Sequence, residues 1–311
     1  MKKSQRNILV ILVIVIATVT CTRIVTVSHT YACNLITHPL EARPCIKKFP
    51  RNYNLPYRDV TVTSADGLKL VGWYIPSQNG AVVIAQHGYK SDRTEMLEEA
   101  QMLYRHGYSV LLTSIRAHDR SEGEQISFGH REMQDLEAWY QYLLTCGDVD
   151  PNRIGIIGNS MGGSLAIQYA AQNENIKAVV AHSAFSSLND TVSVSINHFT
   201  SLPSFPFASL IVFWAEKELD LTISDIDAAK WIQHISPRPV FLMHGGSDTQ
   251  ISIQSGELLY AAAQEPKTLW YEQELGHAKF DETLPEEYER RVTGFFDRYL
   301  LLEEPSELFN P

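Results

Sequence analysis

A serine between two glycines is the residue of this sequence best placed for nucleophilic chemistry. Ser160 stands at the centre of Gly158-Asn159-Ser160-Met161-Gly162. An apolar, strand-like run (154–157) precedes this motif, and a stretch of helix formers (164–170) follows it. A strand that becomes a helix within one residue strains the serine backbone, and it lifts the hydroxyl clear of the sheet beside a helix N-terminus. The pattern predicts that Ser160 attacks a carbonyl carbon; the alternative is a glycine-rich turn that binds phosphate or nothing.

A serine hydroxyl needs a base to take its proton, and that base needs an acid to orient it. Downstream of Ser160, Asp248 lies between an apolar strand-like run and a helix, and His277 lies in the loop after the next predicted strand. Sites of open α/β sheets lie at the carboxyl ends of strands, so two consecutive strand ends would deliver Asp248 and His277 side by side. Taken singly, Asp248 could be a helix N-cap and His277 an exposed loop histidine. In the order serine, acid, histidine they predict a catalytic triad.

The developing oxyanion needs backbone donors. We expect one to be the N–H of Met161, directly after the nucleophile, and the other to be the N–H of Tyr89, in the loop after the third strand. Gly88 beside it would let the backbone approach closely. This chemistry needs no cofactor and no metal. Seven other histidines are expected to be structural or solvated: His87, His118, His130, His182, His198, His234 and His244.

The elements around these residues alternate between strands and helices. A hairpin (57–75) is followed by an apolar run (81–85) of the kind that is buried on both faces of a sheet, and βα units then repeat. An aromatic-rich stretch (about 185–236) interrupts the alternation after the sixth strand, and it predicts a cap over the site. The fold expected is α/β, a mostly parallel eight-stranded sheet with helices on both faces.

Five short motifs resemble those of the α/β-hydrolase superfamily, in its single-domain branch of prolyl-oligopeptidase-like and serine-aminopeptidase-like proteins. They are Asp66-Gly67-x-x-Leu70-x-Gly72-Trp73-Tyr74, His87-Gly88-Tyr89, Gly158-Asn159-Ser160-Met161-Gly162, His244-Gly245-x-x-Asp248 and Gly276-His277. The resemblance covers about residues 57–300. One turn departs from it: relatives carry an Arg-Gly-His-Gly-x-Ser-like sequence where this chain has Arg116-Ala117-His118-Asp119-Arg120-Ser121.

The resemblance implies a serine hydrolase that cleaves an acyl bond, most simply a carboxylic ester, through an acyl-enzyme. The aromatic insertion suggests an apolar acyl or aromatic small-molecule substrate; alternatively, its rings only pack the insertion on the sheet. A serine peptidase or aminopeptidase and an acyltransferase would use the same triad. A binding protein that keeps the fold is the alternative outside enzymes. The oligomeric state stays open.

The N-terminus predicts a membrane partner. A basic leader with Lys2, Lys3 and Arg6 precedes an uncharged apolar run, and the segment 1–27 is expected to be a signal anchor or a cleaved signal peptide. The sequence further predicts a tether over residues 28–56, the hydrolase domain over residues 57–302 and a C-terminal tail over residues 303–311. The catalytic domain would then lie outside the cytoplasm, membrane-anchored or, after cleavage, secreted.

Charge and cysteines add two further expectations. A net charge of −10 gives a nucleic-acid partner no electrostatic support. None of the cysteines has metal-ligand spacing, whereas Cys33 and Cys45 flank a short proline-containing stretch and could form a disulfide in an oxidising compartment.

Overall fold

The computed structural model describes residues 3–301, so the predicted tail (303–311) lies outside the described residues. Its centre is one eight-stranded sheet in the order β1-β2-β4-β3-β5-β6-β7-β8. The strands are β1 (Arg58–Thr63), β2 (Lys69–Ile75), β3 (Val82–Gln86), β4 (Ser109–Thr113), β5 (Ile154–Asn159), β6 (Ile176–His182), β7 (Val240–Gly245) and β8 (Lys267–Glu272). The pairs β1–β2 and β2–β4 are antiparallel, and the other neighbours are parallel. The predicted fold class is confirmed.

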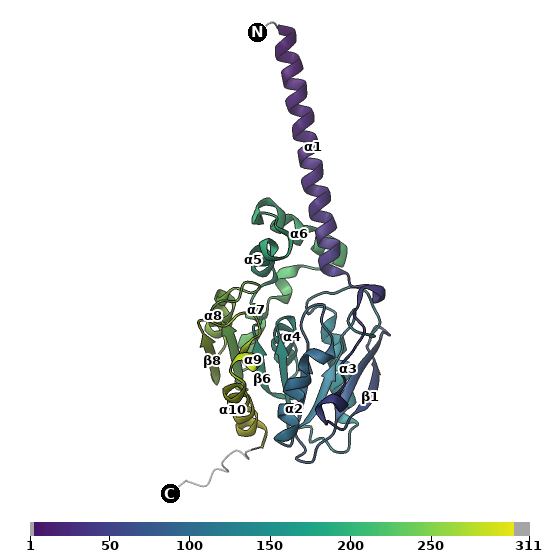
Figure 1. Ribbon diagram of the computed structural model, residues 1–311, viewed down its shortest axis with the longest axis vertical. Helices are drawn as coiled ribbons and strands as arrows, with labels where there is room; N and C mark the ends of the chain where they lie inside the picture. Colours follow the sequence, from purple (N-terminus) through teal and green to yellow (C-terminus); the bar gives the residue numbers. More distant parts are fainter. Residues whose placement is uncertain (1–2, 302–311) are drawn as a thin grey trace.

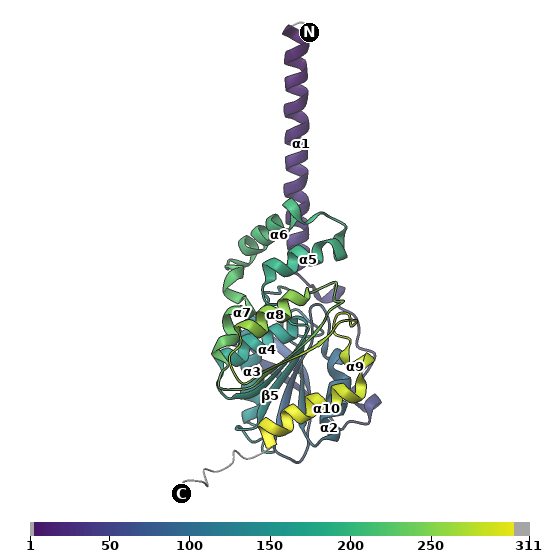
Figure 2. The ribbon, with the colours of Figure 1, turned by 90° about the vertical axis from the view of Figure 1, so that its left-hand side faces the viewer.

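Helices cover both faces of the sheet (Figures 1 and 2). The α-helices are α1 (Lys3–Ile36), α2 (Leu97–Arg105), α3 (Glu132–Leu144), α4 (Met161–Gln172), α5 (Leu188–Thr200), α6 (Ser204–Leu219), α7 (Ala228–Trp231), α8 (Ile253–Ala262), α9 (Phe280–Thr283) and α10 (Pro285–Phe296). Short 3₁₀ turns are η1 (Leu40–Ala42), η2 (Pro50–Tyr53), η3 (Arg93–Met96), η4 (Ile223–Ile226) and η5 (Ile232–His234), and a π-helical turn, η6 (Asp297–Leu301), ends the described chain.

The central strands are apolar along most of their length because both of their faces are buried. In β3, Val82 and Ile84 join the core beneath α3, α4 and α8, whereas Val83 and Ala85 join the core beneath α2 and α10. Successive side chains of a strand point to opposite faces, so a strand covered on both sides is mostly apolar, and the polar residues of β3 and β4 lie at the strand ends.

Between β6 and β7 the chain forms α5, α6, η4, α7 and η5, which we call the helical insertion (188–234). Helices α5 and α6 lie between the sheet and the projecting part of α1 in both views (Figures 1 and 2). The insertion thus falls where the sequence predicts a cap, and the capping role itself stays a prediction.

Helix α1 projects from the globular part and is long and apolar enough to cross a membrane. Its 34 residues span about 51 Å, and the bilayer core needs roughly 30 Å, which the stretch 8–27 supplies. The side chains of residues 4–23 are exposed, whereas Ala32 and Ile36 are buried against the domain. The apolar stretch that could cross a membrane and the packed end are therefore one continuous helix.

The segment predicted as a tether (28–56) differs from that prediction. Helix α1 runs on to Ile36 because this stretch has apolar residues at helical spacing, and it ends shortly before Pro39, as helices tend to before a proline. Beyond it the chain lies on the domain and buries Arg43 and Leu55. The predicted Cys33–Cys45 disulfide is not formed: both are free thiols, because Cys33 faces α6 from within α1 while Cys45 is exposed further along.

Candidate active site

Ser160 occupies the sharp turn between β5 and α4. Its φ of 55° and ψ of −121° are an unfavourable backbone conformation for a residue with a Cβ. Its N–H donates to the carbonyl of His182 at 2.8 Å, which ties the turn to β6. A Cβ on Gly158 would collide with the carbonyl of Gly162, and a Cβ on Gly162 would collide with the carbonyl of Gln86. Both glycines are therefore required by the close approach of backbones around Ser160.

Asp248 and His277 come together beside this turn, at the ends of β7 and β8. The Nδ1 of His277 lies 2.7 Å from Oδ2 of Asp248. The other carboxylate oxygen accepts the N–H groups of Gln250 and Ile251, each at 2.9 Å. Burial raises the pKa of Asp248, but the hydrogen bond from His277 and those from the two amides outweigh it, so the pKa lies below its ordinary value. An ionised carboxylate only accepts, so Nδ1 carries the proton and Nε2 of His277 is free to act as a base.

His244 and Ser183 hold the loops that carry this pair. The Nε2 of His244 lies 3.0 Å from the carbonyl of Ile251, and burial lowers the pKa of His244, so the ring is neutral. The hydroxyl of Ser183 accepts the N–H of Ala278, next to His277, at 3.1 Å. These contacts fit the structural role that the sequence predicts for His244, and they give Ser183 a positioning role that sequence reasoning missed.

The two residues predicted to supply oxyanion donors lie on either side of Ser160. Met161 is the first residue of α4, and Tyr89 lies in the loop after β3. A Cβ on Gly88 would stand 3.3 Å from the Cβ of Ser160, so this loop passes directly against the serine. Ser160, Met161, Tyr89 and His277 all line one cavity.

The cavity has a volume of about 640 Å³ and a mainly apolar wall. Leu188, Val192 and Ile196 of α5 and Ile211 of α6 contribute to it. Such a wall suits an apolar substrate group, with the polar atoms gathered at Ser160.

The end of α1 forms part of this wall, which the prediction of a tether did not foresee. Tyr31, Asn34 and Leu35 line the cavity. The hydroxyl of Tyr89 donates to the Leu35 carbonyl at 2.7 Å, and the Lys90 ammonium donates to the Asn34 carbonyl at 2.6 Å. The loop predicted to hold the oxyanion is thus bound to the helix that would cross the membrane.

Two carboxyl groups that the sequence did not single out lie behind the site. Glu95 lines the cavity and accepts the Gly88 N–H at 3.1 Å, and burial raises its pKa. Glu99 accepts from the side chain of Asn159 at 3.2 Å and from the Tyr288 hydroxyl at 3.3 Å. Burial, with a smaller contribution from Asp281, raises the pKa of Glu99 to about 8, so it is protonated at neutral pH.

The turn that departs from the resemblance keeps a left-handed backbone without its glycines. Ala117 has a φ of 60° and Asp119 a φ of 50°. Its carbonyls accept hydrogen bonds from the segment after α1: His38 lies 2.8 Å from the Ala117 carbonyl, and the Arg43 guanidinium donates to Ser121 at 2.6 Å. The altered turn therefore anchors the N-terminal segment beside the site.

Comparisons with known proteins agree with this architecture. The model of the prolyl oligopeptidase family matches residues 96–302. An esterase of Pyrococcus furiosus is 28% identical, with a TM-score of 0.71, over 85% of this chain and 100% of its own. An uncharacterized protein of Mycobacterium tuberculosis is 32% identical over 71% of this chain and 72% of its own. An acylaminoacyl peptidase of Pyrococcus horikoshii shares the fold alone: it is 19% identical, with a TM-score of 0.63, over 82% of this chain and 43% of its own.

Proposed function

Because the chain belongs to the prolyl oligopeptidase family, we propose that this α/β-hydrolase cleaves a carboxylic ester through an acyl-enzyme formed on Ser160. The observation that carries the proposal is the 2.7 Å hydrogen bond between His277 and Asp248, made at the edge of the cavity that Ser160 lines. An oriented imidazole with a free Nε2 beside a serine on a sharp turn is the arrangement that acyl transfer to serine requires.

In the proposed reaction His277 takes the hydroxyl proton of Ser160 while the serine oxygen attacks the ester carbonyl. The N–H groups of Met161 and Tyr89 stabilise the resulting oxyanion. The protonated His277 gives its proton to the leaving oxygen as the ester C–O bond breaks, which releases the alcohol and leaves the acyl group on Ser160. Water attacks this acyl-enzyme, His277 takes the water's proton, and the proton returns to Ser160 as the carboxylic acid leaves. Asp248 keeps the tautomer of His277 fixed throughout.

The cavity favours an apolar acyl group. Its wall of aliphatic side chains from α5 and α6 can bury a hydrocarbon chain, at about 0.8 kcal/mol for each methylene removed from water. The likeness to the Pyrococcus furiosus esterase over that enzyme's full length supports an ester rather than an amide.

A peptidase is the second candidate, and the family description is what favours it. An aminopeptidase substrate carries a cationic amine, and Glu95 is a carboxyl group that lines the cavity. Burial raises the pKa of Glu95, which weakens it as an anionic partner for an amine. Esters are therefore the expected substrates.

We further propose that α1 is retained as a signal anchor with the catalytic domain outside the cytoplasm. The basic residues precede the span, as the positive-inside rule requires for this orientation. Cleavage after Ala32 would remove Tyr31 from the cavity wall and would take away Ala32, which is buried against the domain. Retention is the arrangement that this packing favours.

The test is hydrolysis of p-nitrophenyl esters with short to long acyl chains by the full chain in detergent micelles, beside the matching anilides. Ser160→Ala should lower kcat by about 10⁴–10⁶ and should abolish covalent labelling by a fluorophosphonate. Ser193→Ala, an exposed serine on α5, is the matched control and should keep both. Equal turnover by Ser160→Ala would exclude the serine mechanism. Faster cleavage of anilides would favour the peptidase, and neither turnover nor labelling would favour a binding protein.

A further inference from the structure

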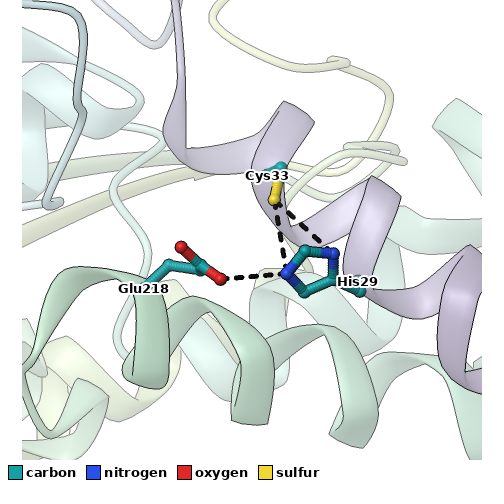
Figure 3. Close-up of side chains that lie close together, drawn as sticks. All are labelled: His29, Cys33 and Glu218. Carbon is teal, nitrogen blue, oxygen red and sulfur yellow. Dashed lines mark hydrogen bonds and ion pairs between the residues drawn. The ribbon is translucent and has the colours of Figure 1, made fainter.

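Three potential metal ligands meet where α1 packs on α6, away from the proposed catalytic residues (Figure 3). His29 and Cys33 stand one turn apart on α1, and Glu218 comes from the last turn of α6. The Nε2 of His29 is 2.9 Å from Oε1 of Glu218 and 3.8 Å from Sγ of Cys33. We propose that these three side chains bind a zinc ion that joins α1 to the helical insertion.

The donor types are those that zinc selects. Imidazole nitrogen, thiolate sulfur and carboxylate oxygen bind zinc at about 2.0–2.1, 2.3 and 2.0–2.2 Å. Tetrahedral angles then separate nitrogen from oxygen by about 3.3 Å and nitrogen from sulfur by about 3.6 Å. The separations of 2.9 and 3.8 Å differ from these by a few tenths of an ångström, and all three ligand atoms lie within 4.8 Å of one another, so side-chain movements would bring them to an ion.

The charges balance when the ion binds. Zinc takes the place of the hydrogen that lies between Nε2 of His29 and Glu218. His29 stays neutral, because it then carries its proton on Nδ1 instead. The thiol of Cys33 releases its proton to solvent. One thiolate and one carboxylate then neutralise the divalent ion. The side chains of His29 and Glu218 are each 43% exposed, so water can occupy the fourth position.

The surroundings hold His29 in place. The ring of Trp214, on α6, packs edge-on against the His29 ring with centroids 5.0 Å apart. Such packing fixes the orientation of a ligand ring before a metal arrives. Since His29 and Cys33 precede the cavity-lining residue Leu35 on the same helix, a bound ion would also steady one wall of the cavity.

Cobalt provides a direct spectroscopic test. The full chain in detergent micelles, freed of metal with a chelator, is titrated with Co²⁺, and zinc is then added. We expect one equivalent of Co²⁺ to produce the visible bands of a tetrahedral site and a thiolate-to-cobalt charge-transfer band, and zinc to displace it. Cys33→Ser should abolish the charge-transfer band. Both Cys33→Ser and His29→Ala should weaken cobalt binding by roughly 100-fold.

Controls separate this site from other thiols and from the catalytic proposal. Cys45→Ser removes an exposed cysteine elsewhere and should leave the cobalt spectrum unchanged. Glu218→Gln alters an exposed side chain, so it should keep the fold while lowering the affinity for cobalt. Circular dichroism checks the fold. Ser160→Ala should bind cobalt like the unaltered protein, so failure of the proposed hydrolase would leave this result intact. A cobalt spectrum without the charge-transfer band, or one that Cys33→Ser retains, would overturn the zinc site.

Discussion

The hydroxyl of Tyr89 donates a hydrogen bond to the carbonyl of Leu35 at 2.7 Å, which joins the loop beside Ser160 to the end of α1. Burial raises the pKa of Tyr89, so the phenol keeps its proton and remains a donor across the physiological range. The N-terminal helix, proposed as the membrane anchor, is therefore also part of the candidate site.

Asp248→Asn should lower kcat by about 10⁴ and leave KM for short esters nearly unchanged. An asparagine amide can donate to Nδ1 of His277, which would stabilise the wrong tautomer and occupy Nε2 with the proton. Steady-state kinetics with one short ester measures this. Asp190→Asn on the exposed face of α5 is the matched control, and a variant of Asp248 within tenfold of the unaltered enzyme would exclude the triad.

Ile196→Trp should shorten the acyl chain that the enzyme prefers. Ile196 is buried in the cavity wall, so a larger ring there takes space from the end of a long chain. Losing two buried methylenes costs about 1.6 kcal/mol, which lowers kcat/KM for long esters roughly tenfold and spares short ones. Val194→Trp, on the exposed side of the same helix, should change neither; an equal effect of both variants would count against the acyl cavity.

Glu99→Gln should make stability less dependent on pH. Burial raises the pKa of Glu99 from 4.5 to about 8, so between these values the folded protein holds a proton that the unfolded chain has lost. This group's contribution is complete below pH 4.5 and declines as the pH rises towards 8, by at most about 1.4 kcal/mol per pH unit. Tm should therefore fall less between pH 5 and 8 in the variant. Glu98→Gln, exposed on the same helix, should keep the original slope.

Arg43→Ala should destabilise the protein by about 3 kcal/mol and release the segment after α1. The guanidinium is buried and donates to the carbonyls of His38 at 2.8 Å, Ser121 at 2.6 Å and Gly123, and these acceptors would lose a charged partner. Thermal unfolding and limited proteolysis between residues 37 and 56 measure the two effects. The exposed Arg120→Ala should leave Tm and the proteolysis pattern unchanged; a stable, uncut Arg43 variant would show that the segment is held elsewhere.

A membrane-impermeant maleimide should label Cys45 from outside spheroplasts. Cys45 is exposed on the catalytic side of α1, whereas Cys33 is half-buried where α1 packs on α6. Cys146 is buried in the domain, and Cys21 belongs to the predicted span. Cys45→Ser should remove most of the label. Labelling that appears only after the membrane is opened would place the domain on the cytoplasmic side.

The sheet and the position of Ser160 could be predicted because local chemistry determines them. Strands buried on both faces are mostly apolar, and the steric demand at Gly158 and Gly162 marks the turn. The meeting of Asp248 and His277 followed from placing each at the end of a parallel strand.

The part of the cavity wall formed by α1 and the buried acids could not be predicted, because their partners are distant in the sequence. The polar stretch after α1 resembles a linker until Arg43 meets the carbonyl of Ser121, 78 residues away. Glu99 looks like a solvated residue of α2, yet it meets Asn159 at a separation of 60 residues and Tyr288 at 189. Burial of such groups depends on the assembled fold and leaves no local pattern.

A protease that cut α1 near its end would free the domain and also open the cavity, since Tyr31, Asn34 and Leu35 belong to both. Release of the domain by such a cut would therefore also inactivate the proposed enzyme. An enzyme anchored as proposed would be confined to the membrane surface on which it was inserted.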